Sequence, residues 1–132
     1  MMDENFSVSL NLMKRALDTY WLRNSLISNN IANVDTPNYK RYDVDFSKVF
    51  DAATTMRLKT TDDRHIDTYA NAEENGVIVR DNSTSQRLDG NNVDIDEEMS
   101  LLAQNTLLYN SLVQQLGNEY RRIRLAINEG RG

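Results

Sequence analysis

The chain has 132 residues, which suits one domain and is too short for a multidomain enzyme. Hydrophobic residues make up 39% of it, below the about 45–50% of an ordinary globular domain, and the formal net charge is -5. The lack of cysteine excludes a disulfide framework, and the single histidine, His65, excludes a site built on several imidazoles. No apolar run reaches the ~18 residues of a membrane span, so we expect neither a span nor a cleaved signal peptide.

Charge is distributed unevenly along the chain. Residues 51–100 carry five basic against twelve acidic side chains, whereas residues 101–132 carry four basic against two acidic ones. A nucleic-acid binder needs a basic face that displaces counterions from phosphates, and the only tight basic cluster is Arg121, Arg122 and Arg124. We interpret this cluster as complementing the negative end of a helix dipole. The charge pattern therefore argues against a nucleic-acid partner.

The first third of the chain is predicted to be one long helix over residues 1–34. Its apolar residues alternate at spacings of four and three, which is typical of helices that pack knobs into holes. We call the residues through which it is expected to pair with another helix its seam. The seam residues of this helix are Phe6, Leu10, Met13, Leu17, Tyr20, Asn24, Ile27, Ile31 and Val34.

A polar middle segment over residues 35–94 follows this helix. Pro37 and Asn38 predict a tight turn in which Asn38 accepts a positive φ angle. Alternation of apolar and acidic residues over 42–46 predicts a short extended run, and short strands are also expected at 56–60 and 77–80. We expect this segment to be irregular or short-β and too poor in apolar residues to cover the helices.

The last third of the chain repeats the helical rhythm over residues 95–128, before a tail at 129–132. Asp94 is expected to cap the first turn of this second helix. Its seam residues are Ile95, Met99, Leu102, Thr106, Tyr109, Val113, Leu116, Tyr120, Ile123 and Ile127.

The two terminal helices together predict a mainly α fold in which they pair as an antiparallel coiled coil. That register places Asn24 beside Thr106, and a buried polar pair at this level would fix the alignment of the helices. The spacing alone leaves open a parallel arrangement between neighbouring subunits.

Large apolar residues also lie off both seams. A two-stranded coil buries only a narrow stripe, so these side chains need further neighbours. We therefore expect them to contact other subunits and the chain to be an assembly protein. The off-seam residues with this expected role are Trp21, Leu22, Leu26, Leu101, Leu108 and Leu112.

The candidate chemistry is thin. Asp43 and Asp45 fit a solvated strand face better than a pair of catalytic carboxylates, and His65 has no nucleophile placed beside it. An EF-hand register through Gly90 puts Arg87 at a calcium-ligand position, where arginine cannot serve. We therefore expect no catalytic site, metal, cofactor or small-molecule substrate.

Residues 28–40, read as SNNIANVDTPNYK, closely resemble the N-terminal motif of bacterial flagellar rod, hook and related axial proteins. Two more blocks agree, one at Thr61 with residues 64–66 and one at residues 89–94 followed by Glu98 and Met99, and together they resemble the proximal type of rod protein. The family usually has glycine where this chain has Asn38. The motif residues are Asn29, Asn30, Ile31, Ala32, Asn33, Thr36, Pro37 and Tyr39.

The resemblance implies a structural subunit of the flagellar basal body. Such proteins pair their terminal helices into cores that polymerise as a hollow rod, which crosses the periplasm in a two-membrane cell and transmits torque. The implied partners are copies of the chain, other rod proteins, the basal-body ring or its FliE adaptor, and the type III export apparatus in transit. The resemblance leaves two roles open for Asn29, Asn30 and Asn33: ending the first helix, or bridging it to the loop or to an adjacent subunit.

A second function class also fits the pattern of an acidic chain with two long helices. It is a soluble helical adaptor or export chaperone that works as a small bundle. Such a protein would be stably folded, with slow amide exchange, whereas a rod subunit would be largely disordered at its ends and gain helix on assembly.

Overall fold

The computed structural model describes residues 2–56, 77–85 and 87–131 of the chain. In chain order its elements are α1 (Met2–Ala32), β1 (Tyr42–Val44), α2 (Phe46–Met56), β2 (Ile78–Arg80) and α4 (Ile95–Glu129). The two long terminal helices confirm the predicted mainly α fold, and the expected short-β character of the middle segment is confirmed by β1 and β2. Across the described residues, no helix combines length with enough apolar character to traverse a bilayer.

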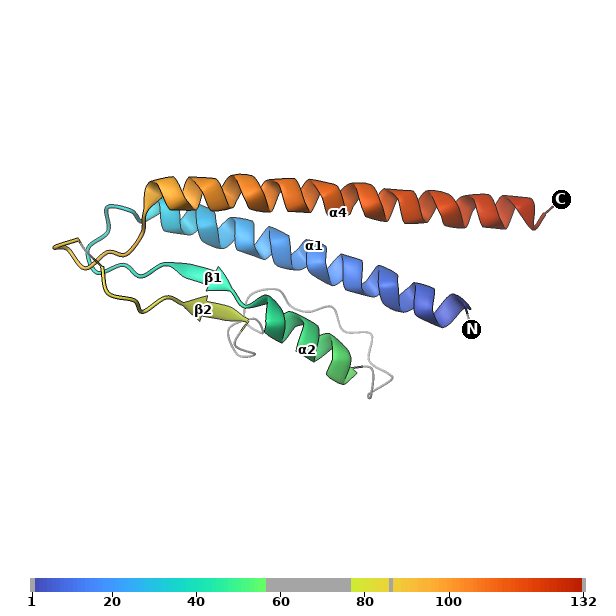
Figure 1. The fold of residues 1–132 in the computed structure, drawn as a ribbon, viewed down its shortest axis with the longest axis horizontal. Helices are drawn as coiled ribbons and strands as arrows, with labels where there is room; N and C mark the ends of the chain where they lie inside the picture. The colour runs from blue at the N-terminus through green and yellow to red at the C-terminus, as the bar shows by residue number, and fades with distance from the viewer. Residues whose placement is uncertain (1, 57–76, 86, 132) are drawn as a thin grey trace.

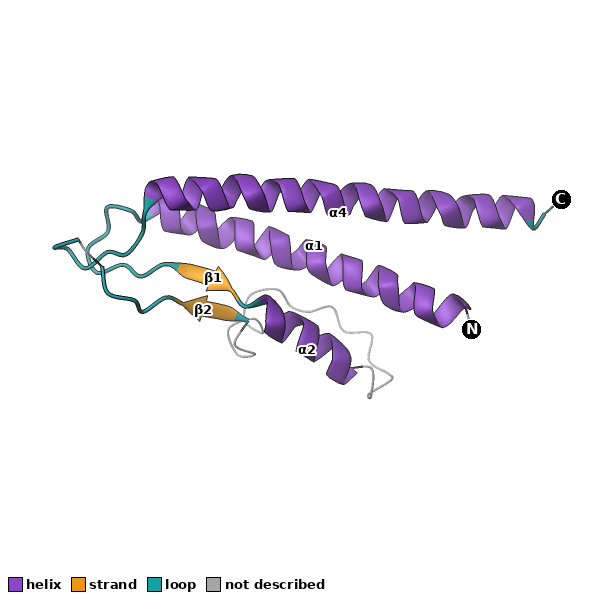
Figure 2. Ribbon diagram, viewed as in Figure 1, coloured by secondary structure: helices purple, strands orange, loops and turns teal. Residues whose placement is uncertain are grey.

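The helix α1 lies between two layers, α4 on one side and the β1, β2 and α2 segment on the other (Figure 1). The helices α1 and α4 run antiparallel, so both chain termini lie at the same end of the molecule. The ribbons of α1 and α4 lie close where α1 ends and α4 begins, and they separate toward the termini. Figure 2 shows that the loops joining α1 to β1 and β2 to α4 lie at the opposite end from the termini. The two helices are therefore joined at one end.

The buried hydrophobic cluster lies between α1 and the middle segment rather than between the two long helices. Leu22 is 5% exposed, and it packs with Leu26 of α1 and Val44 of β1. Half-buried apolar residues that surround this cluster are Tyr42, Phe46, Val49, Val77 and Ile78. This corrects two expectations, because the middle segment does cover part of α1, and Leu22 and Leu26 are buried inside the subunit instead of facing a neighbour.

The strands β1 and β2 form a two-stranded antiparallel sheet that pairs Tyr42 with Arg80 and Val44 with Ile78. The expected extended run at 42–46 is confirmed over β1, and the expected strand at 77–80 is confirmed over β2. The run ends early because Asp45 Oδ1 accepts from the backbone N–H of Ser47 at 3.0 Å, which caps the unpredicted helix α2. The strand expected at 56–60 is wrong at Met56, which ends α2, and residues 57–60 lie outside the described residues.

Helix α4 begins as predicted, with Asp94 Oδ1 accepting from the backbone N–H groups of Asp96 at 2.9 Å and Glu97 at 3.3 Å. At its other end α4 continues to Glu129, and no basic residue lies in its last turn. The interaction with a helix dipole falls off within the last turn, so the dipole does not account for the basic cluster at residues 121–124. Within that cluster, Arg122 pairs instead with Glu119, at 3.3 Å.

The position of the core predicts which leucine matters for stability. We expect Leu26→Ala to lower the free energy of unfolding by about 2–5 kcal/mol, because it opens a cavity between α1 and β1. The matched control is Leu107→Ala on the exposed face of α4, with an expected change within about 0.5 kcal/mol. Urea unfolding of the purified chain followed by circular dichroism measures both. Equal losses in the two variants would contradict this placement of the core.

Candidate functional site

The helix α4 uses a different face from the one that its apolar pattern predicts. Four of the expected seam residues are half-buried: Leu102, Tyr109, Leu116 and Ile123. Two further rows of residues flank this half-buried row, one on each side, and their positions in the sequence differ from each other by one residue. The inner row, which is buried or half-buried, consists of Glu98, Asn105, Leu112 and Glu119. The outer row, which is exposed although the pattern assigned it to the seam, consists of Met99, Thr106, Val113, Tyr120 and Ile127.

Relative to the predicted seam, α4 is rotated about its own axis, so that polar residues take the place of apolar ones on its buried face. Glu98 and Asn105 are each only 1% exposed, whereas the four apolar residues of the outer row are 43–56% exposed. Ile95, expected to begin the seam, is also exposed. The pattern failed here because it ranks positions by apolarity, while the subunit buries polar side chains that have specific hydrogen-bond partners on α1.

The predicted seam residues of α1 differ in their exposure. Ile27 is fully buried, Asn24 is exposed, and the remaining predicted seam residues are half-buried: Phe6, Leu10, Met13, Leu17, Tyr20, Ile31 and Val34. The ring of Tyr20 lies 5.2 Å from the ring of Phe46 in α2, while its backbone carbonyl accepts from Asn105 Nδ2 at 2.9 Å.

The prediction of a buried polar pair formed by Asn24 and Thr106 is wrong. Both side chains are exposed, so neither supplies a buried polar contact between the helices. The buried polar group next to them is Asn105, the neighbour of Thr106, which bonds to the α1 backbone.

The expected contacts with other subunits divide by exposure. Trp21 is 50% exposed and Leu108 is 47% exposed, and each therefore has apolar surface that a neighbour can cover. Leu101 and Leu112 are half-buried. The other two residues with this expected role, Leu22 and Leu26, are buried in the hydrophobic cluster of the subunit and have little surface for a neighbour to cover.

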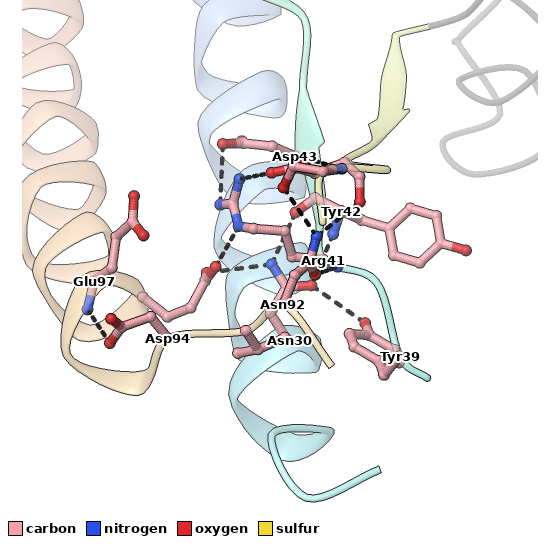
Figure 3. Close-up of polar contacts among 12 residues, drawn as sticks. Asn30, Tyr39, Arg41, Tyr42, Asp43, Asn92, Asp94 and Glu97 are labelled. Atoms are coloured by element: carbon pink, nitrogen blue, oxygen red, sulfur yellow. Dashed lines mark hydrogen bonds and ion pairs between the residues drawn. The ribbon is translucent and has the colours of Figure 1, made fainter. Parts of the chain in front are cut away.

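A polar cluster of buried and half-buried side chains joins the end of α1, the strand β1 and the start of α4 (Figure 3). We call Asn30, Arg41, Asp43 and Glu98 the polar joint. Asn30 is fully buried, and its Nδ2 donates to the Tyr42 carbonyl at 2.8 Å and to Glu98 Oε2 at 3.2 Å. Its Oδ1 accepts from the Tyr42 backbone N–H at 2.9 Å and from the Tyr39 hydroxyl at 3.2 Å. One amide therefore bridges three segments that are distant in the sequence.

Charged groups complete the polar joint. Arg41 Nε donates to Glu98 Oε1 at 2.5 Å, and Arg41 Nη2 lies 3.4 Å from Asp43 Oδ2. Arg23 of α1 donates to the same Asp43 at 2.8 Å. Burial by itself would raise the pKa of Asp43, but hydrogen bonds from Arg23 and the Val44 backbone and the charges of Arg23 and Arg41 outweigh it, so this pKa is lowered. Asp43 is thus held ionised, and its contacts join β1 to α1.

The loop before α4 also holds the C-terminal end of α1. Asn91 is fully buried, and its Nδ2 donates to the carbonyls of Asn33, Val34 and Thr36, each at 2.9 Å. These carbonyls belong to the turn that follows Ala32, the last residue of α1. Asn91 therefore ties this turn to the loop before α4.

Two positive φ angles let these loops approach each other. Asn38 has φ 58° in the turn after α1, as predicted, and its backbone N–H donates to the Asp89 carbonyl at 2.8 Å. Gly90 has φ 76°, and a Cβ atom at this residue would lie 2.6 Å from Asn38 Oδ1. Only glycine fits there without a shift of Asn38.

Comparisons with known proteins identify the family of this chain. Residues 23–40 match the family described as "Flagella basal body rod protein". The chain is 37% identical to the flagellar basal body rod protein FlgB of Bacillus subtilis, over 96% of this chain and 98% of that protein. The chain belongs to the FlgB family of flagellar basal body rod proteins. Its identity to FlgB of Borreliella burgdorferi is 32%, over 93% and 98% of the two chains, and to FlgB of Escherichia coli it is 28%, over 96% and 98%.

Membership in the FlgB family identifies the chain as a structural component of the flagellar basal body, associated with other components of that structure. The segment that matches the family, 23–40, includes Arg23 and Asn30 and ends next to Arg41. Asn30 and Arg41, which both donate to Glu98 of α4, therefore lie in this segment or directly beside it.

The three asparagines of the FlgB motif differ in their contacts. Asn30 bridges α1 to the loop and to α4, as described above. The Asn33 side chain donates to the Asn29 carbonyl at 2.8 Å and accepts from Thr36 at 3.1 Å, which is local to the helix end. The Asn29 side chain is exposed. Asn30 thus bridges α1 to the loop and to α4, whereas the side-chain contacts of Asn33 are those of a residue at the end of the helix.

Sequence reasoning missed Glu98, Asn105, Arg41 and Asn91 as functional side chains. A usable signal was present for Asn91 and Glu98 in the family-like block at residues 89–94 and 98–99, but nothing in the spacing identified their partners. His65 lies outside the described residues, and among those described no group of three or more acidic or histidine side chains is placed to hold a metal ion.

The lowered pKa of Asp43 predicts a defined pH dependence of stability. An unfolded Asp titrates near about 3.9, so the stabilisation by this carboxylate is fully present above that pH and is lost as the pH falls through the lower folded-state pKa. We expect Asp43→Asn to lower stability at pH 7 by about 1–3 kcal/mol and to flatten the loss of stability from about pH 5 down to about pH 2.

Urea midpoints measured across this pH range test the prediction for Asp43. The matched control is Asp35→Asn, at an exposed residue of the turn, which we expect to follow the native profile. If the Asp43→Asn profile paralleled the native one at every pH, the carboxylate would not carry this stabilisation.

Proposed function

We propose that this chain is the proximal rod subunit, which polymerises through its terminal helices into the hollow drive shaft of the flagellum. The observation that carries the proposal is the exposed outer row of α4. It extends from Met99 to Ile127, about 42 Å at 1.5 Å per residue, and its apolar members are 43–56% exposed. Full burial of one such side chain contributes about 1.5–3 kcal/mol, so a neighbour that covers the row gains substantially.

Apolar surface on several sides of the subunit favours an extended assembly over a simple pair. Leu108 lies on the opposite flank of the seam from the outer row, and it is 47% exposed. Trp21 on α1 and Phe50 on α2 are also exposed, on different layers of the fold. A two-fold dimer needs one self-complementary patch, whereas rings and helical assemblies need at least two different patches. The arrangement of these patches supports a tube.

The partners follow from the same proposal. We assign to the rod subunit contacts with copies of itself, with other rod proteins and with the basal-body ring or its FliE adaptor, in a rod that crosses the periplasm. Export through the type III apparatus without a cleaved signal belongs to this assignment. A chain without cysteine forms no disulfide that would hinder passage in an unfolded state.

A charge placed on the exposed apolar surface tests the proposal. We expect Leu108→Asp to abolish rod assembly and swimming while export of the subunit continues, because burial of the carboxylate at a subunit contact is unfavourable. Gln114→Asp is the matched control, since it adds the same charge at an exposed polar residue of the same helix. We expect this control to swim normally.

The measurements are swimming in soft agar, the amount of subunit in purified basal bodies and the amount exported. Normal swimming with Leu108→Asp would refute the outward-facing role of this residue. A native subunit that stays in the cytosol as a stable bundle, absent from basal bodies, would favour the alternative of a soluble acidic adaptor or export chaperone.

A further inference from the structure

The helix α4 has two possible faces for packing on α1, and they differ by one residue. Both include the half-buried residues Leu102, Tyr109, Leu116 and Ile123. Together with the outer row they form the more apolar face, and together with the inner row they form the more polar face. In the subunit the polar face is the one that is buried, which is the reverse of what apolar burial alone favours.

We propose that the buried polar pair Glu98 and Asn105 sets the rotation of α4 about its own axis and so keeps the outer row on the surface of the subunit. The two side chains act as positioning residues. They select one of two packings that share the row Leu102, Tyr109, Leu116 and Ile123.

Glu98 fixes the rotation at the start of α4. Its two carboxylate oxygens accept from Arg41 and from Asn30, and it is 1% exposed. A rotation by one residue, about 100°, would carry the carboxylate away from both donors and bring Met99 in its place. The thioether of Met99 cannot accept two such hydrogen bonds, so the half-buried Arg41 and the buried Asn30 would be left with fewer partners.

Asn105 fixes the rotation two turns further along. Its Nδ2 donates to the Tyr20 carbonyl of α1, while its Oδ1 is buried and has no hydrogen-bond partner among the described residues. A buried acceptor without a partner is unfavourable, so this side chain is a poor choice for stability alone. Single buried asparagines in helix pairs are known instead to specify alignment at a cost in stability.

The consequence for assembly rests on the proposed function. If α4 turned its outer row inward, the subunit would satisfy its own apolar surface and would present the polar inner row to its neighbours. The polar pair therefore prevents the subunit from closing on itself before it meets the rod.

Thiol labelling of the purified full-length chain measures the rotation without any assembly. The chain contains no cysteine, so Leu112→Cys and Val113→Cys each introduce a single thiol, one on the inner row and one on the outer row. In the native background we expect a soluble maleimide to modify the thiol at 113 several-fold faster than the thiol at 112. With Glu98→Ala and Asn105→Ala together, we expect the order of the two rates to reverse.

Two further variants keep this test decisive. Glu119→Ala removes an inner-row carboxylate whose bonds are within α4, so we expect the native order of rates. If the double variant loses helix by circular dichroism, Asn105→Ala alone, with the polar joint intact, is expected to narrow the difference between the two rates. An unchanged rate order and ratio in a folded double variant, or an equal effect of Glu119→Ala, would overturn the proposal. Neither result would bear on assembly, which the swimming of Leu108→Asp tests separately.

Discussion

The carboxylate of Glu98, buried between the guanidinium of Arg41 and the amide of Asn30, is the interaction on which the rest of this structure depends. A buried charge is strongly unfavourable unless it is paired and hydrogen-bonded, so the three groups have little freedom to move apart. They come from α4, from the segment leading into β1 and from α1. One small cluster thus connects all three layers of the fold, and Asn91 ties the loops together beside it.

Because the ordering contacts are polar and lie at one end, the apolar surface of the long helices is left for other uses. The hydrophobic cluster of the subunit is small and lies under β1, where Leu22, Leu26 and Val44 meet. The outer row and Leu108 of α4 stay exposed. A subunit of this kind has a defined geometry at the joint and adhesive surface along its length, and this combination suits a part that must match its neighbours in a continuous shaft.

The helices, their ends and several turns could be predicted from the sequence because they depend on local patterns. The alternation of apolar residues, the Asp94 cap and the positive φ of Asn38 are each readable within a few residues. The rotation of α4 could not be predicted in this way. A heptad pattern marks apolar residues but does not say whether their partner is the same chain or another copy, and here both cases occur on one helix.

The missed features share a second cause. Glu98 meets Asn30 across 68 positions and Asn91 meets Val34 across 57, so no spacing within one element indicates these pairs. The helix α2 was missed because its start overlaps an alternating run that also fits a strand, and a hydrogen bond from the Ser47 backbone to Asp45 decides between them. The burial of Leu22 and Leu26 was missed for the same reason, because a middle segment interpreted as irregular offered no surface to cover them.

The most direct test of the account compares one surface before and after assembly. The Val113→Cys variant places a single thiol in the middle of the outer row. It is used in a strain that swims with this variant as its rod subunit. The account predicts that a soluble maleimide modifies this thiol rapidly in the free subunit and very slowly in intact purified basal bodies, because a neighbouring chain covers it there. Equal rates in the two states would contradict the claim that the helices of this chain hold the rod together.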